Sequence, residues 1–341
     1  MMIKRFLYLI YYFKELDRSK LKLFMNHVVR EKKVNRVSLW WDIILSSLRY
    51  NISILEYFQF HFFEKEINRS AYAGTGYMYE YQKLMNPPAS RDVLADKLKF
   101  LKEYSSFVKH SYVSLRELEE NHARGGGLLT KPAGKVVLKS TDGQCGNGIE
   151  VISTSSLSTD KLIAELKRTR NDFAEEFVVQ HPALMTLSPA GLNTVRIITQ
   201  LDKEGRVDII GARLRITVNS AVDNLAAGNL AATIDPKTGI VTGPGVYSDI
   251  TKKETRFHPI TNQPITGFQV PLWQETISMI TAAALHNTSN RSIGWDIAIT
   301  EAGPELIEGN HDWCKLLWQL PAKQGLKHIL EPYKHSYEKR K

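Results

Sequence analysis

Apolar side chains recur at helical spacing through the first ninety residues. The segments 21–29, 37–48 and 52–63 carry them three and four positions apart, which is the pattern of amphipathic helices. Two consecutive prolines, Pro87-Pro88, then interrupt the pattern, because proline stops a helix that precedes it. We therefore expect an N-terminal helical region over residues 1–90.

An apolar run of eight, Phe6 to Phe13, lies near the start of the sequence with basic residues on both sides. It is too short to cross a bilayer, and no small-residue cleavage site follows it, so the pattern indicates neither a membrane span nor a secretory signal. Two arrangements fit: a helix that packs on its own protein, and a helix that lies on an anionic membrane surface.

Beyond residue 90 the pattern changes to short apolar runs that alternate with helical segments. We expect helices over 91–107 and 159–169, a further helix of about fifteen residues that ends near Asn287, and a glycine-rich loop at 125–127. Runs rich in β-branched and apolar residues predict strands, and they lie at 135–139, 149–152, 173–180, 192–200 and 209–218.

The stretch 292–310 predicts a β-hairpin. Two arms rich in β-branched and apolar residues flank a three-residue loop that ends at Gly303, where a hairpin favours a positive φ. With the turn centred on Ala302, Ile299 faces Glu305 and Asp296 faces Glu308. Asn310 follows Glu308 by two positions, so its side chain points to the same face.

Two carboxylates that face each other repel, unless a cation lies between them. Mg²⁺ is a hard ion that takes carboxylate and amide oxygens and keeps positions open for phosphates. Asp296, Glu308 and Asn310 are therefore candidate metal ligands. The alternative is an ordinary hairpin whose acidic side faces solvent.

A strand that ends at Lys139 leads into a loop with glycines at 143, 146 and 148, and a second strand follows. Glycines let backbone N–H groups approach phosphate oxygens closely, and a lysine at the entrance of the loop adds a positive charge. The lysine precedes the glycines, so this is not a Walker loop. A generic glycine-rich hairpin is the alternative.

Three arginines lie within predicted strands: Arg196 in one, and Arg213 and Arg215 in the next. An arginine in so apolar a strand needs an anionic partner. Structural ion pairs with Asp202 or Asp208 would provide it, and so would a site for phosphate or carboxylate groups of a substrate.

The chain of 341 residues has a formal net charge of +9 and only two cysteines. The length allows two or three domains, and the cysteine content suits a reducing compartment. The charge fits nucleic acid, anionic lipid or phosphorylated substrates. Nucleic acid is not favoured, because the aromatic residues cluster in apolar helices and do not alternate with Lys and Arg on a strand.

Lys139 with its glycine loop, the Glu175–Val178 connector, the strand arginines and the acidic hairpin occur in the order seen in ATP-grasp enzymes. The chain most resembles the sugar-transfer-associated ATP-grasp proteins over about residues 55–325. The segments that carry this resemblance are Gln180–Leu184, Leu192–Arg196, Val222–Asn224, Gly294–Asp296 and Leu306–Asn310.

The resemblance implies an α+β fold, in which two α+β subdomains sandwich ATP after the N-terminal helical region. The ATP-grasp domain would span residues 91–330, with an ATP-lid subdomain at about 130–180 and a metal and substrate subdomain at about 181–325. A basic tail would follow at 331–341.

The same resemblance implies roles for individual residues. Lys97 and Lys139 would contact the phosphates, covered by the loop with Gly143, Gly146 and Gly148, and adenine would lie against the connector Glu176, Phe177 and Val178. Asp296, Glu308 and Asn310 would hold Mg²⁺, with Mn²⁺ as an alternative. Arg196, Arg213 and Arg215 would stabilise the transferred phosphate and bind a substrate carboxylate.

The implied function is an ATP-dependent ligase that forms an acylphosphate and joins an amino acid or other amine to a sugar or sugar acid for a surface polysaccharide such as a capsule. The sugar could be a small molecule or lipid-linked, which places the protein in the cytoplasm or at the inner face of the membrane. The alternatives are phosphoryl transfer to a non-carboxylate acceptor and a non-catalytic nucleotide or polyanion binder.

Overall fold

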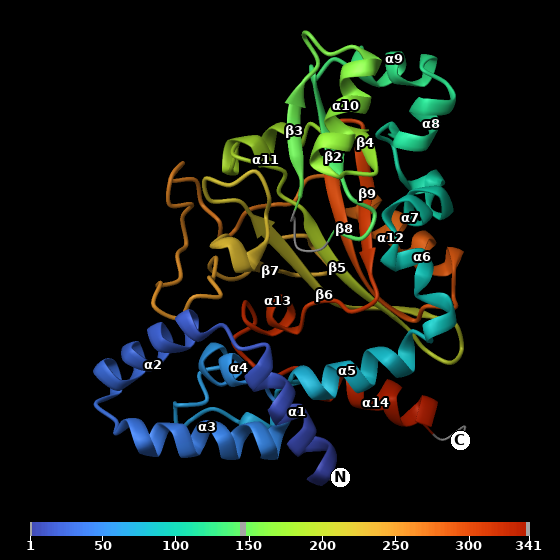
Figure 1. The fold of residues 1–341 in the computed structure, drawn as a ribbon. Coiled ribbons are helices and arrows are strands. Elements are labelled where there is room, and N and C mark those ends of the chain that lie inside the picture. The colour runs from blue at the N-terminus through green and yellow to red at the C-terminus, as the bar shows by residue number, and fades with distance from the viewer. Residues whose placement is uncertain (1, 144–147, 339–341) are drawn as a thin grey trace.

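The computed structural model describes residues 2–143 and 148–338. It contains a group of N-terminal helices, two antiparallel sheets and the helices that pack on these sheets (Figure 1). A four-stranded sheet, sheet A, has the strand order β1-β4-β2-β3. A five-stranded sheet, sheet B, has the order β7-β6-β5-β8-β9. The α+β expectation is confirmed.

The first sixty residues form four helices: α1 (Met2–Lys14), α2 (Arg18–Lys32), α3 (Arg36–Tyr50) and α4 (Ile54–Gln59). Three of them begin at a side chain that accepts hydrogen bonds from the first turn, namely Asp17, Asn35 and Ser53. Such caps satisfy amide groups that a helix start leaves unpaired. The fourth helix ends at Gln59, earlier than the pattern over 52–63 predicts.

The expected helix over 91–107 is divided. After α5 (Thr75–Met85), the structure has α6 (Asp92–Ala95) and α7 (Lys97–Glu103), followed by a short 3₁₀ turn. Asp96 separates α6 from α7, because its backbone is extended and its carboxylate accepts a hydrogen bond from the amide of Lys99 at 3.0 Å. Lys97, at the start of α7, donates its ammonium to the carbonyl of Gly143.

Sheet A is built from β1 (Tyr112–Ser114), β2 (Lys135–Lys139), β3 (Glu150–Ser153) and β4 (Phe173–Glu176). Its outer face packs on α8 (Leu115–Glu120), α9 (Ala123–Leu129) and α10 (Thr159–Thr169) through Leu118, Leu128 and Leu162. The glycines at 125–127 lie inside α9, so the expected glycine-rich loop is a helix. Helix α10 has the predicted limits, and Ser158 caps it.

Sheet B is built from β5 (Val195–Leu201), β6 (Val207–Ile216), β7 (Leu230–Ile234), β8 (Ser292–Thr300) and β9 (Gly303–Asn310), and α11 (Pro182–Leu187) precedes it in the chain. One face of sheet B packs on α7 and on α12 (Trp273–His286) in the main hydrophobic core. The other face is covered in part by α5, α13 (Lys315–Gln319) and α14 (Lys327–Glu338). The uncovered part of that face, where Arg215 and Asp296 lie, faces sheet A.

Candidate functional site

A cavity of about 330 Å³ separates the inner face of sheet A from the uncovered part of sheet B. Lysines and apolar side chains line it on the side of sheet A, and charged side chains line it on the side of sheet B. The lining includes Lys97, Val137, Lys139, Gly143, Val151, Glu175, Phe177 and Val178 from the first side, and Thr194, Arg215, Asp223, Asp296 and Glu308 from the second.

The β8–β9 hairpin brings Asp296 opposite Glu308, as predicted. The predicted pairing of Ile299 with Glu305 is wrong, since Ile299 pairs with Pro304 and Ala298 with Glu305. The turn holds two residues, not three, between Thr300 and Gly303. A register shift beside Asp296 then adds one residue on β9 at Ile307. This β-bulge turns Glu308 out of the core and into the cavity.

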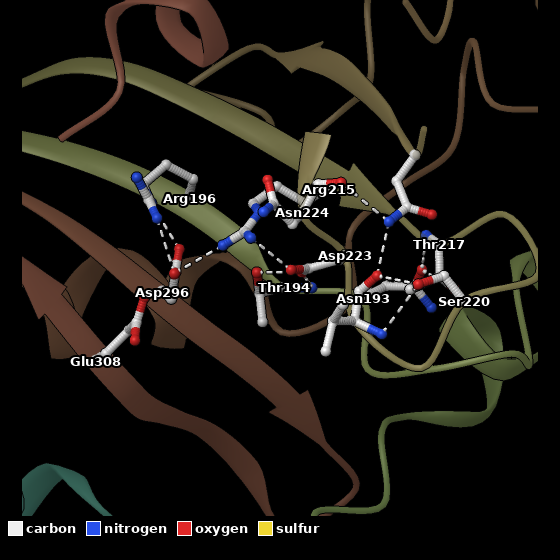
Figure 2. Close-up of polar contacts among 12 residues, drawn as sticks. Asn193, Thr194, Arg196, Arg215, Thr217, Ser220, Asp223, Asn224, Asp296 and Glu308 are labelled. Atoms are coloured by element: carbon white, nitrogen blue, oxygen red, sulfur yellow. Dashed lines mark hydrogen bonds and ion pairs between the residues drawn. The ribbon is translucent and has the colours of Figure 1, made fainter. Parts of the chain in front are cut away.

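A chain of buried ion pairs fixes the side of the cavity formed by sheet B (Figure 2). Arg196 holds Asp296 with two hydrogen bonds, from Nε to Oδ1 at 2.6 Å and from Nη2 to Oδ2 at 2.8 Å. Arg215 donates to Asp296 at 2.7 Å and pairs with Asp223 at 2.6 Å. Thr194 in turn donates its amide and hydroxyl to Asp223 at 2.8 and 2.5 Å.

The two facing carboxyl groups have opposite electrostatic environments. Burial alone would raise the pKa of Asp296, but the charges of Arg196 and Arg215 outweigh burial and hold this pKa well below its usual range. Burial and the charge of Asp296 raise the pKa of Glu308. Glu308 therefore holds a proton more readily than Asp296, and a cation beside it would release that proton.

On the other side of the cavity, Lys139 forms an ion pair with Glu175, and the Lys97 ammonium donates to the carbonyl of Gly143. Burial lowers the pKa of Lys97, although the charge of Glu308 opposes that effect. Lys139 of β2 and Lys97 of α7 thus line the same side of the cavity. A phosphate group bound in the cavity would therefore lie beside two positive charges.

His110, which the sequence did not single out, joins the two sheets. Its Nδ1 lies 2.7 Å from Glu305 of β9, and its Nε2 lies 3.7 Å from Glu175 of β4. Burial alone would lower the pKa of His110, but the two carboxylates raise it to about 9. A protonated His110 therefore bridges the strand beside Lys139 and the strand that carries Glu308. It lies in irregular chain before β1 and outside the sequence motifs described above.

Several residues singled out from the sequence lie away from the cavity lining. Arg213 donates to the carbonyl of Trp318, below the helices that cover sheet B, and burial lowers its pKa to about 10. Glu176 lies on the outer face of β4, where it pairs with Lys131 at 2.9 Å. Arg196 reaches the site through Asp296. Gly148 is not among the lining residues, and Gly146 lies outside the described residues.

The hairpin residues fit a hard divalent cation. Asn310 donates its amide N–H to Glu308 at 3.2 Å and to the carbonyl of Gly294 at 3.3 Å, which leaves its own oxygen as a ligand. Asp296 accepts three bonds from arginines, one fewer than the roughly four that a carboxylate can take. Among the described residues no three His, Cys, Asp or Glu side chains form a metal cluster. Further ligands would have to come from substrate oxygens and water.

The family model described as "Sugar-transfer associated ATP-grasp" matches residues 77–335. No curated protein matches the chain closely enough to count as a relative.

The chain is also similar, at low identity, to parts of solved structures. The biotin carboxylase domain of a 2-oxoglutarate carboxylase from Hydrogenobacter thermophilus is 15% identical, with 68% of this chain and 46% of that chain covered and a TM-score of 0.38. Biotin carboxylase from Campylobacter jejuni is 11% identical, with 70% and 46% covered and a TM-score of 0.43. D-alanine–D-alanine ligase from Bacillus anthracis, complexed with ATP, is 10% identical, with 73% and 69% covered and a TM-score of 0.43. The chain spans less than half the length of the first two.

Proposed function

Because the chain belongs to the sugar-transfer associated ATP-grasp family, we propose that it is an ATP-dependent carboxylate–amine ligase. The observation that carries this proposal is the cavity between the sheets. Lys97 and Lys139 line one side of it, and Arg215, Asp296 and Glu308 line the other. Cations on both sides and a carboxylate that can hold a metal ion suit a polyphosphate.

ATP would place its phosphates between the two lysines and the hairpin, with adenine against the apolar surface of Val151, Phe177 and Val178. Glu308, Asn310 and the remaining acceptor site of Asp296 would hold Mg²⁺ or Mn²⁺. When bound, the ion would neutralise charge on the phosphates.

Arg215 is the residue best placed to act on the transferred phosphoryl group. Its guanidinium is fixed between Asp223 and Asp296, and its buried Nε has no hydrogen-bond partner among the described residues. A preorganised donor of this kind stabilises charge that develops on a phosphoryl or carboxylate oxygen. Arg196 is a positioning residue, since it acts through Asp296.

In the proposed reaction a carboxylate oxygen of the acceptor attacks the γ-phosphorus of ATP, and ADP leaves. An amine nitrogen then attacks the carbonyl carbon of the acylphosphate, inorganic phosphate leaves, and the amine loses a proton. We propose an amino acid and a sugar or sugar acid as the joined groups, in surface polysaccharide synthesis in the cytoplasm or at the inner face of the membrane. The family description supports the sugar part of this proposal.

The test is ADP formation with Mg²⁺ while separate pools of amino acids and uronic acids are supplied, with and without hydroxylamine. Stimulation by a carboxylate pool, together with a trapped hydroxamate, is the expected result. ADP formation with a phosphorylated alcohol and no hydroxamate would identify a phosphotransferase instead. No turnover with any pool would leave a nucleotide or polyanion binder.

A further inference from the structure

A second cavity, of about 530 Å³, lies where α1, α3, α5 and α14 meet, at the end of the molecule remote from sheet A (Figure 1). Five Lys and Arg side chains and two glutamates line it, and a third glutamate, Glu338, pairs with Lys334 at 3.7 Å, which leaves a surplus of two positive charges. The basic residues are Lys4, Arg5, Arg49, Lys327 and Lys334, and the acids are Glu80 and Glu331.

The hydrogen-bonding and charge state of this lining points to an anionic ligand. Lys327 and Lys334 each lie 5.0 Å from the ring centroid of Tyr77, whose buried hydroxyl has no hydrogen-bond partner within the described part of the chain. Arg49 forms no ion pair with a carboxylate of a described residue. A phosphate would supply acceptor oxygens and the missing negative charge.

An exposed apolar stripe on α3 leads into this cavity. Val37, Trp41 and Leu45 lie four residues apart and are 64%, 62% and 59% exposed. Arg49 is the next residue on the same line of the helix, and it lines the cavity. Residues four apart on a helix lie on one face, so the stripe and the cation form a continuous surface.

Helix α1 also exposes apolar side chains. It packs on α3, where Arg5 donates hydrogen bonds to the carbonyls of Leu48 and Arg49. The exposed side chains are Phe6, Leu7, Ile10, Tyr11 and Phe13. Contiguous apolar patches on a protein surface mark sites of contact with a partner or a membrane. Among the described residues, no helix is long and apolar enough to cross a membrane.

Charge selects the occupant of this surface. Residues 1–50 contain eleven Lys and Arg and four Asp and Glu, so they hold +7 of the chain's formal charge of +9. A second copy docked on the same face would bring two such regions together, and like charges would oppose the contact. An anionic bilayer surface attracts the same region.

We propose that the cavity binds the phosphate of an anionic membrane lipid while the apolar side chains of α1 and α3 enter the boundary between headgroups and acyl chains. The two parts act together, as basic and apolar residues do in interfacial helices. This inference is independent of the ligase proposal, because it rests on a surface remote from the nucleotide cavity.

The experiment is sedimentation of the full chain with vesicles of phosphatidylglycerol or of phosphatidylcholine, without nucleotide. We expect binding to the anionic vesicles only. The stripe variant Trp41→Ser/Leu45→Ser should bind at least about tenfold more weakly, and the cavity variant Arg49→Gln/Lys327→Gln should lose about fivefold per removed charge. Matched controls are Ile260→Ser, at a residue that is 60% exposed and lies outside α1 and α3, and Arg168→Gln on α10.

Unfolding temperatures of all variants should match the wild type, so that loss of binding is not loss of fold. Failure of the wild-type protein to bind anionic vesicles would overturn the proposal. Stripe variants that bind these vesicles as tightly as the controls would also overturn it. Binding of inorganic phosphate without binding of vesicles would identify a soluble ligand instead. A wild-type dimer that Trp41→Ser converts to a monomer would assign the surface to a second copy.

Discussion

Asp296 and Glu308 face each other across the β8–β9 ladder, yet within the described chain only Asp296 forms ion pairs, with Arg196 and Arg215. The arginines compensate one carboxylate and leave the other to whatever binds in the cavity. This asymmetry gives the two acids different roles. Asp296 organises the protein, and Glu308 is available to a ligand.

Replacement Glu308→Gln should therefore separate stability from activity. Because burial and Asp296 raise the pKa of Glu308, a neutral isostere at this position should leave the free energy of unfolding unchanged or raise it by up to about 1 kcal/mol at pH 7. ADP formation should fall by about 100-fold or more, since a metal ligand is lost.

The matched control is Glu301→Gln, in the exposed turn of the same hairpin. Urea unfolding and ADP formation are measured on both variants. Equal turnover in Glu308→Gln and Glu301→Gln would remove Glu308 from the metal site.

Arg196→Met should destabilise the fold strongly. It removes a buried partner of Asp296 and leaves that carboxylate with Arg215 as its one ion-pair partner among the described residues. Breaking a buried ion pair costs about 3–5 kcal/mol. Arg206→Met is the control, because Arg206 pairs with Asp202 at the same 2.6 Å while its side chain is 77% exposed. An exposed pair contributes about 0–1 kcal/mol. Similar losses in the two variants would contradict the assigned role of burial.

The hairpin shows how far the sequence could lead. Its two arms and the facing of Asp296 and Glu308 were predictable from alternation and from Gly303, because these are local properties of a hairpin. The turn was predicted one residue too long and the bulge at Ile307 was not foreseen. The two differences cancel at Asp296 and leave an error at Ile299, which lies between them.

Partners of buried charges could not be predicted from spacing alone. The sequence offered Asp202 and Asp208 as partners for the strand arginines, but Asp202 pairs with Arg206, and Asp208 accepts a hydrogen bond from Tyr333. Arg196 and Arg215 pair instead with Asp296 of β8. Asp296 lies 100 residues from Arg196 and 81 residues from Arg215 in the sequence. Which strand lies beside β5 is a tertiary property that periodicity does not contain.

Helix α9 offers a test of a corrected element. Gly126 and Gly127 lie in a helix and have open space around their Cα atoms, so alanine at each should stabilise the fold by about 0.5–1 kcal/mol. Gly134→Ala is the contrast, since Gly134 also has open space but a φ of +62°, and alanine there should be destabilising by about 1 kcal/mol. No gain from either helix replacement would favour the loop that the sequence suggested.

His110 should make stability depend on pH above neutrality. Its pKa rises from 6.5 to about 9 in the folded protein, through Glu175 and Glu305. A group whose pKa is raised on folding stabilises the fold fully below its unfolded pKa, and that contribution disappears as the pH rises through the folded pKa. The free energy of unfolding should therefore fall between about pH 6.5 and 9, by on the order of 3 kcal/mol.

His110→Gln should be less stable at pH 6.5 and should lack most of this decline, whereas His328→Gln, at an exposed position of α14, should keep it. Urea unfolding at half-unit steps from pH 6 to 9.5 measures both variants. Since His110 joins the strand of Glu175, which holds Lys139, to the strand of Glu308, the KM for ATP should rise over the same pH range in the wild type. A stability profile of His110→Gln that parallels the wild type would show that the bridge carries no charge, and the two sheets would then be coupled by packing alone.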